Sequence, residues 1–178
     1  MKNIINHVIL LIMLAFSIAC SNEVSLQYVI SEHQLKEGWA VESSAKVNAT
    51  GDIISKKDYD ISKWYKTTIP STVMAALIAN GEYADVFMGI NISRVDTSRF
   101  RTSWWYRTTF NVEDAGKTTE LIFEGINYRA NIWLNGSMVA SADTLFGGFR
   151  IFKINVSEFT VTGDRKSTRL NSSHVSQA

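Results

Sequence analysis

Histidine and cysteine, which bind zinc and take part in nucleophilic catalysis, are scarce in this chain. The only histidines are His7, His33 and His174, and the only cysteine is Cys20. One cysteine cannot form a disulfide within the chain, and these four residues are too scattered for a clustered zinc site. A serine–histidine–aspartate triad would depend on His33 alone, because the other histidines lie in the terminal segments, and no motif surrounds it. The sequence therefore offers no motif for such a triad, and we expect no metal site and no cofactor.

Cys20 directly follows an apolar run from Val8 to Ala19. This run is too short to span a bilayer and is typical of the core of a signal peptide. The residues from Ser17 to Cys20 resemble a bacterial lipobox, in which the cysteine becomes the acylated first residue of the mature protein. We therefore expect residues 1–20 to be a lipoprotein signal peptide, and the protein to be exported and lipid-anchored to a bacterial membrane, periplasmic or at the cell surface. The alternative is an ordinary secretory signal with an incidental cysteine.

The C-terminal segment has an unusual identity. The residues from Asp164 to His174 read DRKSTRLNSSH, and their codons spell a string that resembles a common short-read sequencing adapter. Agreement over this length is not a chance event, although the composition alone also fits a polar disordered tail. We expect residues 164–178 to be an assembly artefact and the natural chain to be cut near Gly163.

The composition is that of a globular protein with one domain. Hydrophobic residues make up 46% of the chain and charged residues 20%, and both fractions are normal for a folded protein. The 18 basic and 17 acidic residues give a formal net charge of +1. The sequence therefore shows no basic patch that would predict binding to nucleic acid.

Residues 21–38 are expected to be a tether, and strand-like alternation begins at Trp39. A short helix is predicted after Pro70, with Ser71 or Thr72 as its cap and Gly81 just past its end. Residues 85–101 have no clean period and predict a long loop. Loops of this length inside compact domains are often functional.

From Ser103 onward the pattern is mostly that of strands. Trp104 and Trp105 are neighbours on one strand, so their side chains are expected on opposite faces, one in the core and one at a surface or domain interface. Asn135 and Gly136 form a strong hairpin signal, since both turn positions require positive φ. Many short strands with one short helix predict a mainly β fold, an antiparallel β-sandwich of jelly-roll type.

Four blocks of sequence are similar to the sugar-binding domain that opens glycoside hydrolase family 2 enzymes. They read WAVESSAKV from Trp39, IPSTVMAALIANGEYADVFMGIN from Ile69, SWWYRTTF from Ser103 and LIFEGINYRANIWLNGSMVASADTLFGGFR from Leu121. They look most like the branch of exo-β-D-glucosaminidases and β-mannosidases. The resemblance implies that residues 39–163 are this galactose-binding-like domain, incomplete at its C-terminus.

Enzymes of this family are retaining, with one glutamate as acid/base and a second as nucleophile. Both come from a (β/α)₈ barrel that alone needs about 250 residues, and nothing of it exists in this chain. Glu120, Glu124 and Glu158 belong to predicted strands or turns, where we expect them to be solvated or ion-paired. We assign no catalytic role to them.

The resemblance also indicates binding residues. In related enzymes a polar residue from the loops of this domain reaches the terminal sugar bound in the barrel, and Asp85 and Asn91 are the candidates here for substrate binding. The alternative for both is plain loop capping. The segment from Asn127 to Arg129 is expected to face the catalytic domain.

The resemblance thus implies the N-terminal fragment of an exported glycosidase that releases a terminal β-linked hexosamine or mannose from a carbohydrate. The expected partners are carbohydrate ends, the missing barrel of the same chain and, through the lipid anchor, a membrane. We expect the fragment itself to be inactive. The alternatives are a non-catalytic carbohydrate-binding lipoprotein and a structural β-sandwich that packs on another protein.

Overall fold

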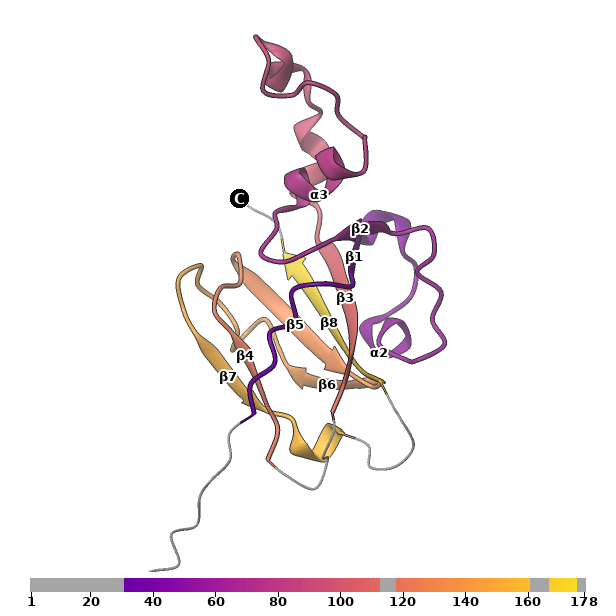
Figure 1. Cartoon of the computed structure of the whole chain (residues 1–178), viewed down its shortest axis with the longest axis vertical. Helices are drawn as coiled ribbons and strands as arrows, with labels where there is room; N and C mark the ends of the chain where they lie inside the picture. Colours follow the sequence, from indigo (N-terminus) through magenta and orange to yellow (C-terminus); the bar gives the residue numbers. More distant parts are fainter. Residues whose placement is uncertain (1–30, 113–117, 161–166, 176–178) are drawn as a thin grey trace, which may run out of the picture. The chain divides into compact units, whose positions relative to one another are not determined.

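Two antiparallel sheets form the fold of this protein (Figure 1). The computed structural model describes residues 31–112, 118–160 and 167–175, with the backbone alone for the last range. The predicted signal peptide and Cys20 lie outside the described residues. The chain divides between His33 and Gln34, and all the described elements belong to the second unit.

Sheet A has six strands in the order β2-β1-β3-β8-β5-β6, and sheet B pairs β4 with β7. The strands of sheet A are β1 (Trp39–Ser43), β2 (Tyr65–Thr67), β3 (Trp104–Asn111), β5 (Arg129–Leu134), β6 (Ser137–Ala140) and β8 (Ser167–Val175). The strands of sheet B are β4 (Glu120–Phe123) and β7 (Phe152–Asn155). The predicted mainly β, antiparallel fold is confirmed.

The main core lies between the two sheets. Alternation along β5 directs Ala130, Ile132 and Leu134 to this side, where they pack with Leu121 of β4 and with Val156 after β7. Ile132, Leu134 and Val156 are fully buried. Burying a side chain of this size contributes about 1.5–3 kcal/mol to folding, so this layer fixes the register of β5.

A second apolar cluster covers the opposite face of sheet A. Ile54, Trp64 and Trp105 are buried there, and the rings of Trp105 and Trp133 lie 5.5 Å apart between centroids. Both residues of the Trp104–Trp105 pair are therefore buried, with 2% of Trp104 and 8% of Trp105 exposed. The prediction that one of them lies at a surface or domain interface is wrong, because the segment between β1 and β2 folds over this face (Figure 1).

The predicted helix is α3 (Val73–Ala79), and local hydrogen bonds mark both of its ends. The Thr72 side chain accepts a hydrogen bond from the Ala75 amide at the N-terminus. Gly81 has φ +80°, and the amides of Gly81 and Glu82 donate to the carbonyls of Ile78 and Leu77. This is a Schellman ending, for which a glycine is favoured at the left-handed position.

A second helix, α2 (Gly51–Ile54), was not predicted from the sequence. It lies beside the hairpin that joins β5 to β6, where Asn135 and Gly136 have the predicted positive φ values of 52° and 93°. The Gly136 amide donates to the Ser55 hydroxyl over 2.9 Å. The hairpin thereby holds the end of α2 against the sheet.

Strand β8 fills the position between β3 and β5. It is antiparallel to both, and Trp104 and Ala130 are each paired with His174. The sequence pattern assigned these residues to an assembly artefact. Sheet ladders are formed by main-chain groups that every non-proline residue carries. The pairing of β8 therefore does not show whether these residues belong to the natural protein. The assignment of residues 164–178 to an assembly artefact stays a prediction.

Candidate functional site

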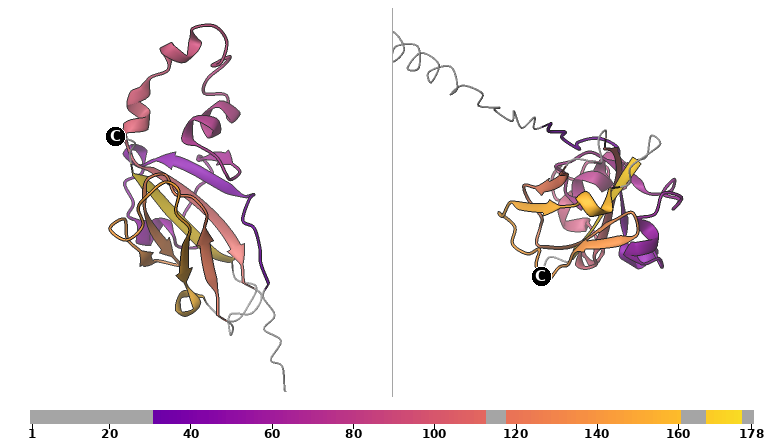
Figure 2. Two further views of the ribbon diagram at one scale, coloured as in Figure 1. Left: turned by 90° about the vertical axis from the view of Figure 1, so that its left-hand side faces the viewer. Right: turned by 90° about the horizontal axis from the view of Figure 1, so that it is seen from below.

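The long loop between α3 and β3 is the candidate site. It contains two short 3₁₀ turns, η2 (Asn91–Arg94) and η3 (Thr97–Arg101). Figure 1 and the left view of Figure 2 show this loop extending past the end of sheet A at which β3 begins. The predicted long loop is therefore present, and short turns rather than strands give it its shape.

The structure brings the two predicted site residues, Asp85 and Asn91, together. The Asn91 amide Nδ2 donates to the Asp85 main-chain carbonyl over 3.0 Å, and the Met88 amide donates to the same oxygen over 2.9 Å. Asp85 has φ +50°, a left-handed conformation that aspartate adopts more readily than most residues. The Asn91 side chain therefore caps the turn. Loop capping was the alternative to substrate binding that the sequence left open for this residue.

The Asp85 carboxylate differs from the Asn91 amide in its surroundings. Asp85 is exposed while Asn91 is half-buried, and no hydrogen bond to the Asp85 carboxylate is formed within the described parts of the chain. Its neighbour Val86 is only 4% exposed and anchors the start of the turn. Of the two residues, Asp85 is the one whose functional group is available to a ligand.

Four large apolar side chains surround this turn and face solvent. They are Phe87, Met88, Ile90 and Ile92, with exposed fractions between 54% and 78%. A group of exposed apolar side chains of this kind is typical of a surface that contacts another molecule or domain.

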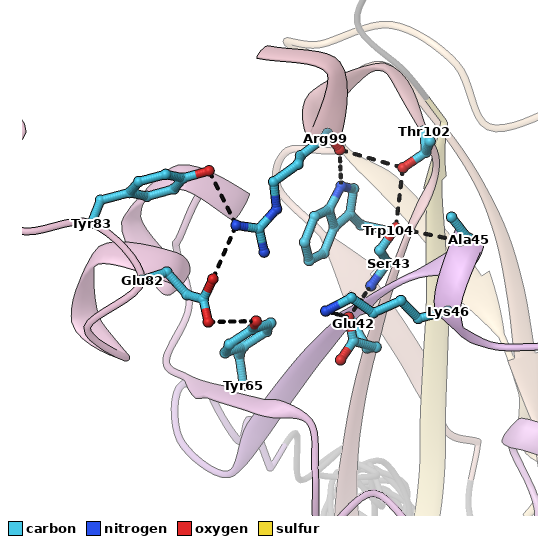
Figure 3. A network of polar contacts seen from close by, with 10 residues as sticks. All are labelled: Glu42, Ser43, Ala45, Lys46, Tyr65, Glu82, Tyr83, Arg99, Thr102 and Trp104. Atoms are coloured by element: carbon cyan, nitrogen blue, oxygen red, sulfur yellow. Dashed lines mark hydrogen bonds and ion pairs between the residues drawn. The ribbon is translucent and has the colours of Figure 1, made fainter. Parts of the chain in front are cut away.

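The base of the loop is held by a polar network centred on Arg99 (Figure 3). The Arg99 guanidinium donates to the Glu82 carboxylate over 3.0 Å and to the Tyr83 hydroxyl over 3.2 Å. The Tyr65 hydroxyl of β2 donates to the other oxygen of Glu82 over 2.8 Å. These bonds join the two ends of the loop to each other and to sheet A.

The network fixes the charge states of its members. Hydrogen bonds from Tyr65 and then Arg99 lower the pKa of the Glu82 carboxyl below its ordinary value. Burial opposes the charge of the guanidinium, but the hydrogen bonds with Glu82 and Tyr83 outweigh burial and raise the pKa of Arg99. Because Glu82 accepts hydrogen bonds from both Tyr65 and Arg99, its carboxylate holds the two ends of the loop together.

The network continues into sheet A through the main chain of Arg99. Its carbonyl accepts hydrogen bonds from the Trp104 indole over 3.0 Å and from the Thr102 hydroxyl over 3.3 Å. Thr102 in turn lies 3.2 Å from the Ser43 hydroxyl of β1. The sequence did not indicate Arg99 or Glu82, because these opposite charges are distant in the sequence and meet only in the folded chain.

Within the described residues, other parts of the surface offer little catalytic chemistry. Glu120, Glu124 and Glu158 are exposed, as predicted. Among the residues that the structure describes, no three His, Cys, Asp or Glu side chains are grouped so as to hold a metal ion. Two solvent-open grooves, one beside α3 and one beside Asp58, do not include Asp85 or Asn91. In the same part of the chain, no helix is long and apolar enough to cross a membrane.

The mainly β, antiparallel fold is that of a galactose-binding-like domain. Residues 39–172 match the family described as the glycosyl hydrolase 2 galactose-binding domain-like family. The chain therefore belongs to this family, as its sequence blocks predicted.

Proteins similar to this chain include enzymes from two groups. The chain is 36% identical over 126 residues to an exo-β-D-glucosaminidase of Amycolatopsis orientalis, which covers 71% of this chain and 12% of that protein. It is 29% identical over 124 residues to β-mannosidase B of Emericella nidulans, covering 68% of this chain and 13% of that protein. The crystal structure of the Amycolatopsis orientalis exo-chitosanase CsxA superposes with a TM-score of 0.74 at 32% identity, covering 82% of this chain and 17% of that one. The chain thus spans less than a fifth of the length of these relatives.

Proposed function

We propose that this chain is the N-terminal domain of an exported glycosidase that releases a terminal β-linked hexosamine or mannose from a carbohydrate. The observation that supports this proposal is the family match over residues 39–172, together with relatives named exo-β-D-glucosaminidase and β-mannosidase. The catalytic acid/base and nucleophile of the retaining reaction are two carboxylates of a barrel that this domain does not contain. The domain without that barrel is inactive.

In this proposal, the loop between α3 and β3 reaches the terminal sugar. The Asp85 carboxylate is the ligand-contacting group, and the Asn91 amide holds the turn that presents it. The polar network around Arg99 fixes the base of the loop, so the main chain that carries the carboxylate is held in place before the sugar arrives. Preorganisation of this kind reduces the entropy lost on binding. A carboxylate also favours a hexosamine with a protonated amine over mannose.

The proposed route of export is acylation of Cys20 after removal of the signal peptide that precedes it. The sequence at Ser17 to Cys20 supports this route, and one acyl chain together with a second anchors a protein stably in a membrane. Labelling of cells with a radioactive fatty acid tests it. Label on the wild-type protein and none on Cys20→Ser is the expected result; equal label on both contradicts the lipid anchor.

Long-read sequencing of the locus is the decisive experiment for the glycosidase. We expect an open reading frame that diverges from this chain near Gly163 and continues into a barrel with two catalytic glutamates. An immediate stop codon would contradict the enzyme and leave a non-catalytic carbohydrate-binding lipoprotein. The encoded full chain should hydrolyse p-nitrophenyl β-D-glucosaminide or the β-D-mannoside, whereas the 178-residue chain should show no turnover on either.

A further inference from the structure

The side chain of Asn80, the residue that follows helix α3, is hydrogen-bonded to the main chain of strand β2. Its nitrogen Nδ2 donates to the Lys66 carbonyl over 2.8 Å, and its oxygen Oδ1 accepts from the Lys66 amide over 3.2 Å. Nδ2 also donates to the Ala76 carbonyl of α3 over 2.7 Å. A carboxamide has two N–H donors, so both donors of Asn80 are used. We call these three hydrogen bonds the Asn80 clamp.

The Asn80 clamp completes one edge of sheet A. Within the described residues β2 is an edge strand that pairs with β1 alone, and Lys66 lies opposite Ala40. In an antiparallel ladder, alternate residue pairs exchange both of their main-chain hydrogen bonds. The Asn80 carboxamide makes the same exchange with Lys66 on the side away from β1. The side chain therefore takes the place of one residue of a further strand.

Apolar packing does not fill the space between β2 and α3 on this side. A solvent-open groove of about 790 Å³ is lined by residues of both elements. Thr67 and Thr68 line it from the strand, and the short side chains of Ala75 and Ala79 line it from the helix. Because side chains leave this groove open, the polar bonds of Asn80 are what join the end of the helix to the strand.

The Asn80 clamp lies where the candidate-site loop begins. Asp85 follows Asn80 by five residues. Between them, the Glu82 carboxylate accepts a hydrogen bond from the Tyr65 hydroxyl over 2.8 Å. Two neighbouring residues of β2, Tyr65 and Lys66, therefore hold the first residues of the loop. The position of this segment relative to sheet A is set before the chain reaches Asp85.

We propose that Asn80 is a positioning residue of the sugar site. By completing the edge of β2, its carboxamide sets where the main chain of Asp85 lies relative to sheet A. Asn80 acts through residues 81–85 and does not itself contact the sugar. This inference rests on the proposed function, because it requires that Asp85 binds the terminal sugar.

Steady-state kinetics of the full chain encoded by the locus, on the same two aryl glycosides, tests the proposal. Asn80→Ala should raise KM at least about 5-fold, which corresponds to the loss of one ordinary hydrogen bond, and should leave kcat nearly unchanged. A purely structural role would instead reduce the amount of folded enzyme, which lowers the apparent kcat and leaves KM unchanged. A wild-type KM, or a loss confined to kcat, would overturn the proposal.

Thr72→Ala is the matched control. Thr72 caps the other end of the same helix, so its loss lowers the stability of α3 while the Asn80 clamp stays intact. The KM of this variant should remain within about 2-fold of the wild-type value. An equal rise in KM for Thr72→Ala and Asn80→Ala would assign the effect to the helix as a whole and contradict the positioning role.

Hydrogen exchange of the Lys66 amide measures the clamp without any need for activity. This amide donates to Asn80, so it should exchange at least about 5-fold faster in Asn80→Ala and at the wild-type rate in Thr72→Ala. Equal exchange in Asn80→Ala and the wild type would overturn the clamp.

Asn80→Asp provides a variant of the same size. It keeps an acceptor for the Lys66 amide but, when ionised, has no donor for the Lys66 carbonyl. It should therefore raise KM while the Lys66 amide stays protected. If Asn80→Ala does not fold, this variant decides the question, and a wild-type KM for it overturns the proposal.

These outcomes separate the two proposals. A lowered kcat/KM for Asp85→Asn together with a wild-type KM for Asn80→Ala contradicts the positioning role alone. A full chain that hydrolyses neither aryl glycoside contradicts the glycosidase and, with it, the positioning role.

Discussion

Gly51 of α2 lies directly against the indole ring of Trp133 on β5. A β-carbon at position 51 would lie 2.3 Å from ring atoms Cδ2 and Cε2 of Trp133. Trp133 itself packs on Trp105 in the cluster that covers this face of sheet A. The contact between a residue without a side chain and a large ring is therefore what allows α2 to approach the sheet.

Gly51→Ala should destabilise the domain. Either the indole or the helix must move, and overpacking of this kind costs about 1–3 kcal/mol. Urea unfolding followed by tryptophan fluorescence measures the difference. Gly148→Ala is the matched control, because a β-carbon there would meet nothing within 4 Å, and it should change the unfolding free energy by less than about 0.5 kcal/mol. Equal stability of the two variants would contradict the packing argument.

Arg107→Met should also destabilise the domain, by about 3 kcal/mol. Arg107 is only 1% exposed, and its guanidinium donates to the carbonyls of Ile54 and Lys56 over 2.9 Å each. Methionine fills a similar volume but leaves these carbonyls without their donors. Thr109→Ala, an exposed position on the same strand, should be nearly neutral in the same unfolding experiment. A loss of less than about 1 kcal/mol for Arg107→Met would show that water replaces the guanidinium.

The local features of the fold could be predicted from the sequence. The Thr72 cap, the Gly81 ending of α3 and the Asn135-Gly136 turn are each specified by residues within one or two turns of chain. The alternation of β5 correctly directs Trp133 away from Ile132. In each case the residue that determines the local conformation is close in the sequence to the residues that adopt it.

Features that depend on distant residues could not be predicted in this way. Trp105 is buried because the segment containing Ile54 and Trp64 folds over it, and no period in strand β3 reports that cover. The ion pair between Glu82 and Arg99 closes a loop whose ends meet only in the folded chain. For Asp85 and Asn91, the sequence could name the residues, but the hydrogen bond that distinguishes capping from binding appears only in three dimensions.

Substitutions of Asp85 and Asn91 in the full chain should therefore have different effects. Asp85→Asn keeps the size of the side chain but removes the proposed ligand contact, and it should lower kcat/KM by about 10–100-fold without changing the unfolding temperature. Asn91→Ala removes one of the two hydrogen bonds to the Asp85 carbonyl, so it should lower kcat/KM and also speed proteolysis of the loop. Steady-state kinetics measures kcat/KM for the two variants, and limited proteolysis measures the cleavage rate of the loop. If Asp85→Asn has the same kcat/KM as the wild type, Asp85 does not bind the substrate.

The Arg99 network should weaken in acid. Because hydrogen bonds from Tyr65 and Arg99 lower the folded-state pKa of Glu82 below 4.5, its stabilisation is complete above that value and is lost as the pH falls through the folded-state pKa. A ¹³C NMR titration of the Glu82 carboxyl should give a midpoint below 4.5 in the wild type, and the midpoint should rise in both Tyr65→Phe and Arg99→Gln. Lys63→Gln, outside the network, should leave the midpoint unchanged. A wild-type midpoint at or above 4.5 would mean that the network does not hold the loop in solution.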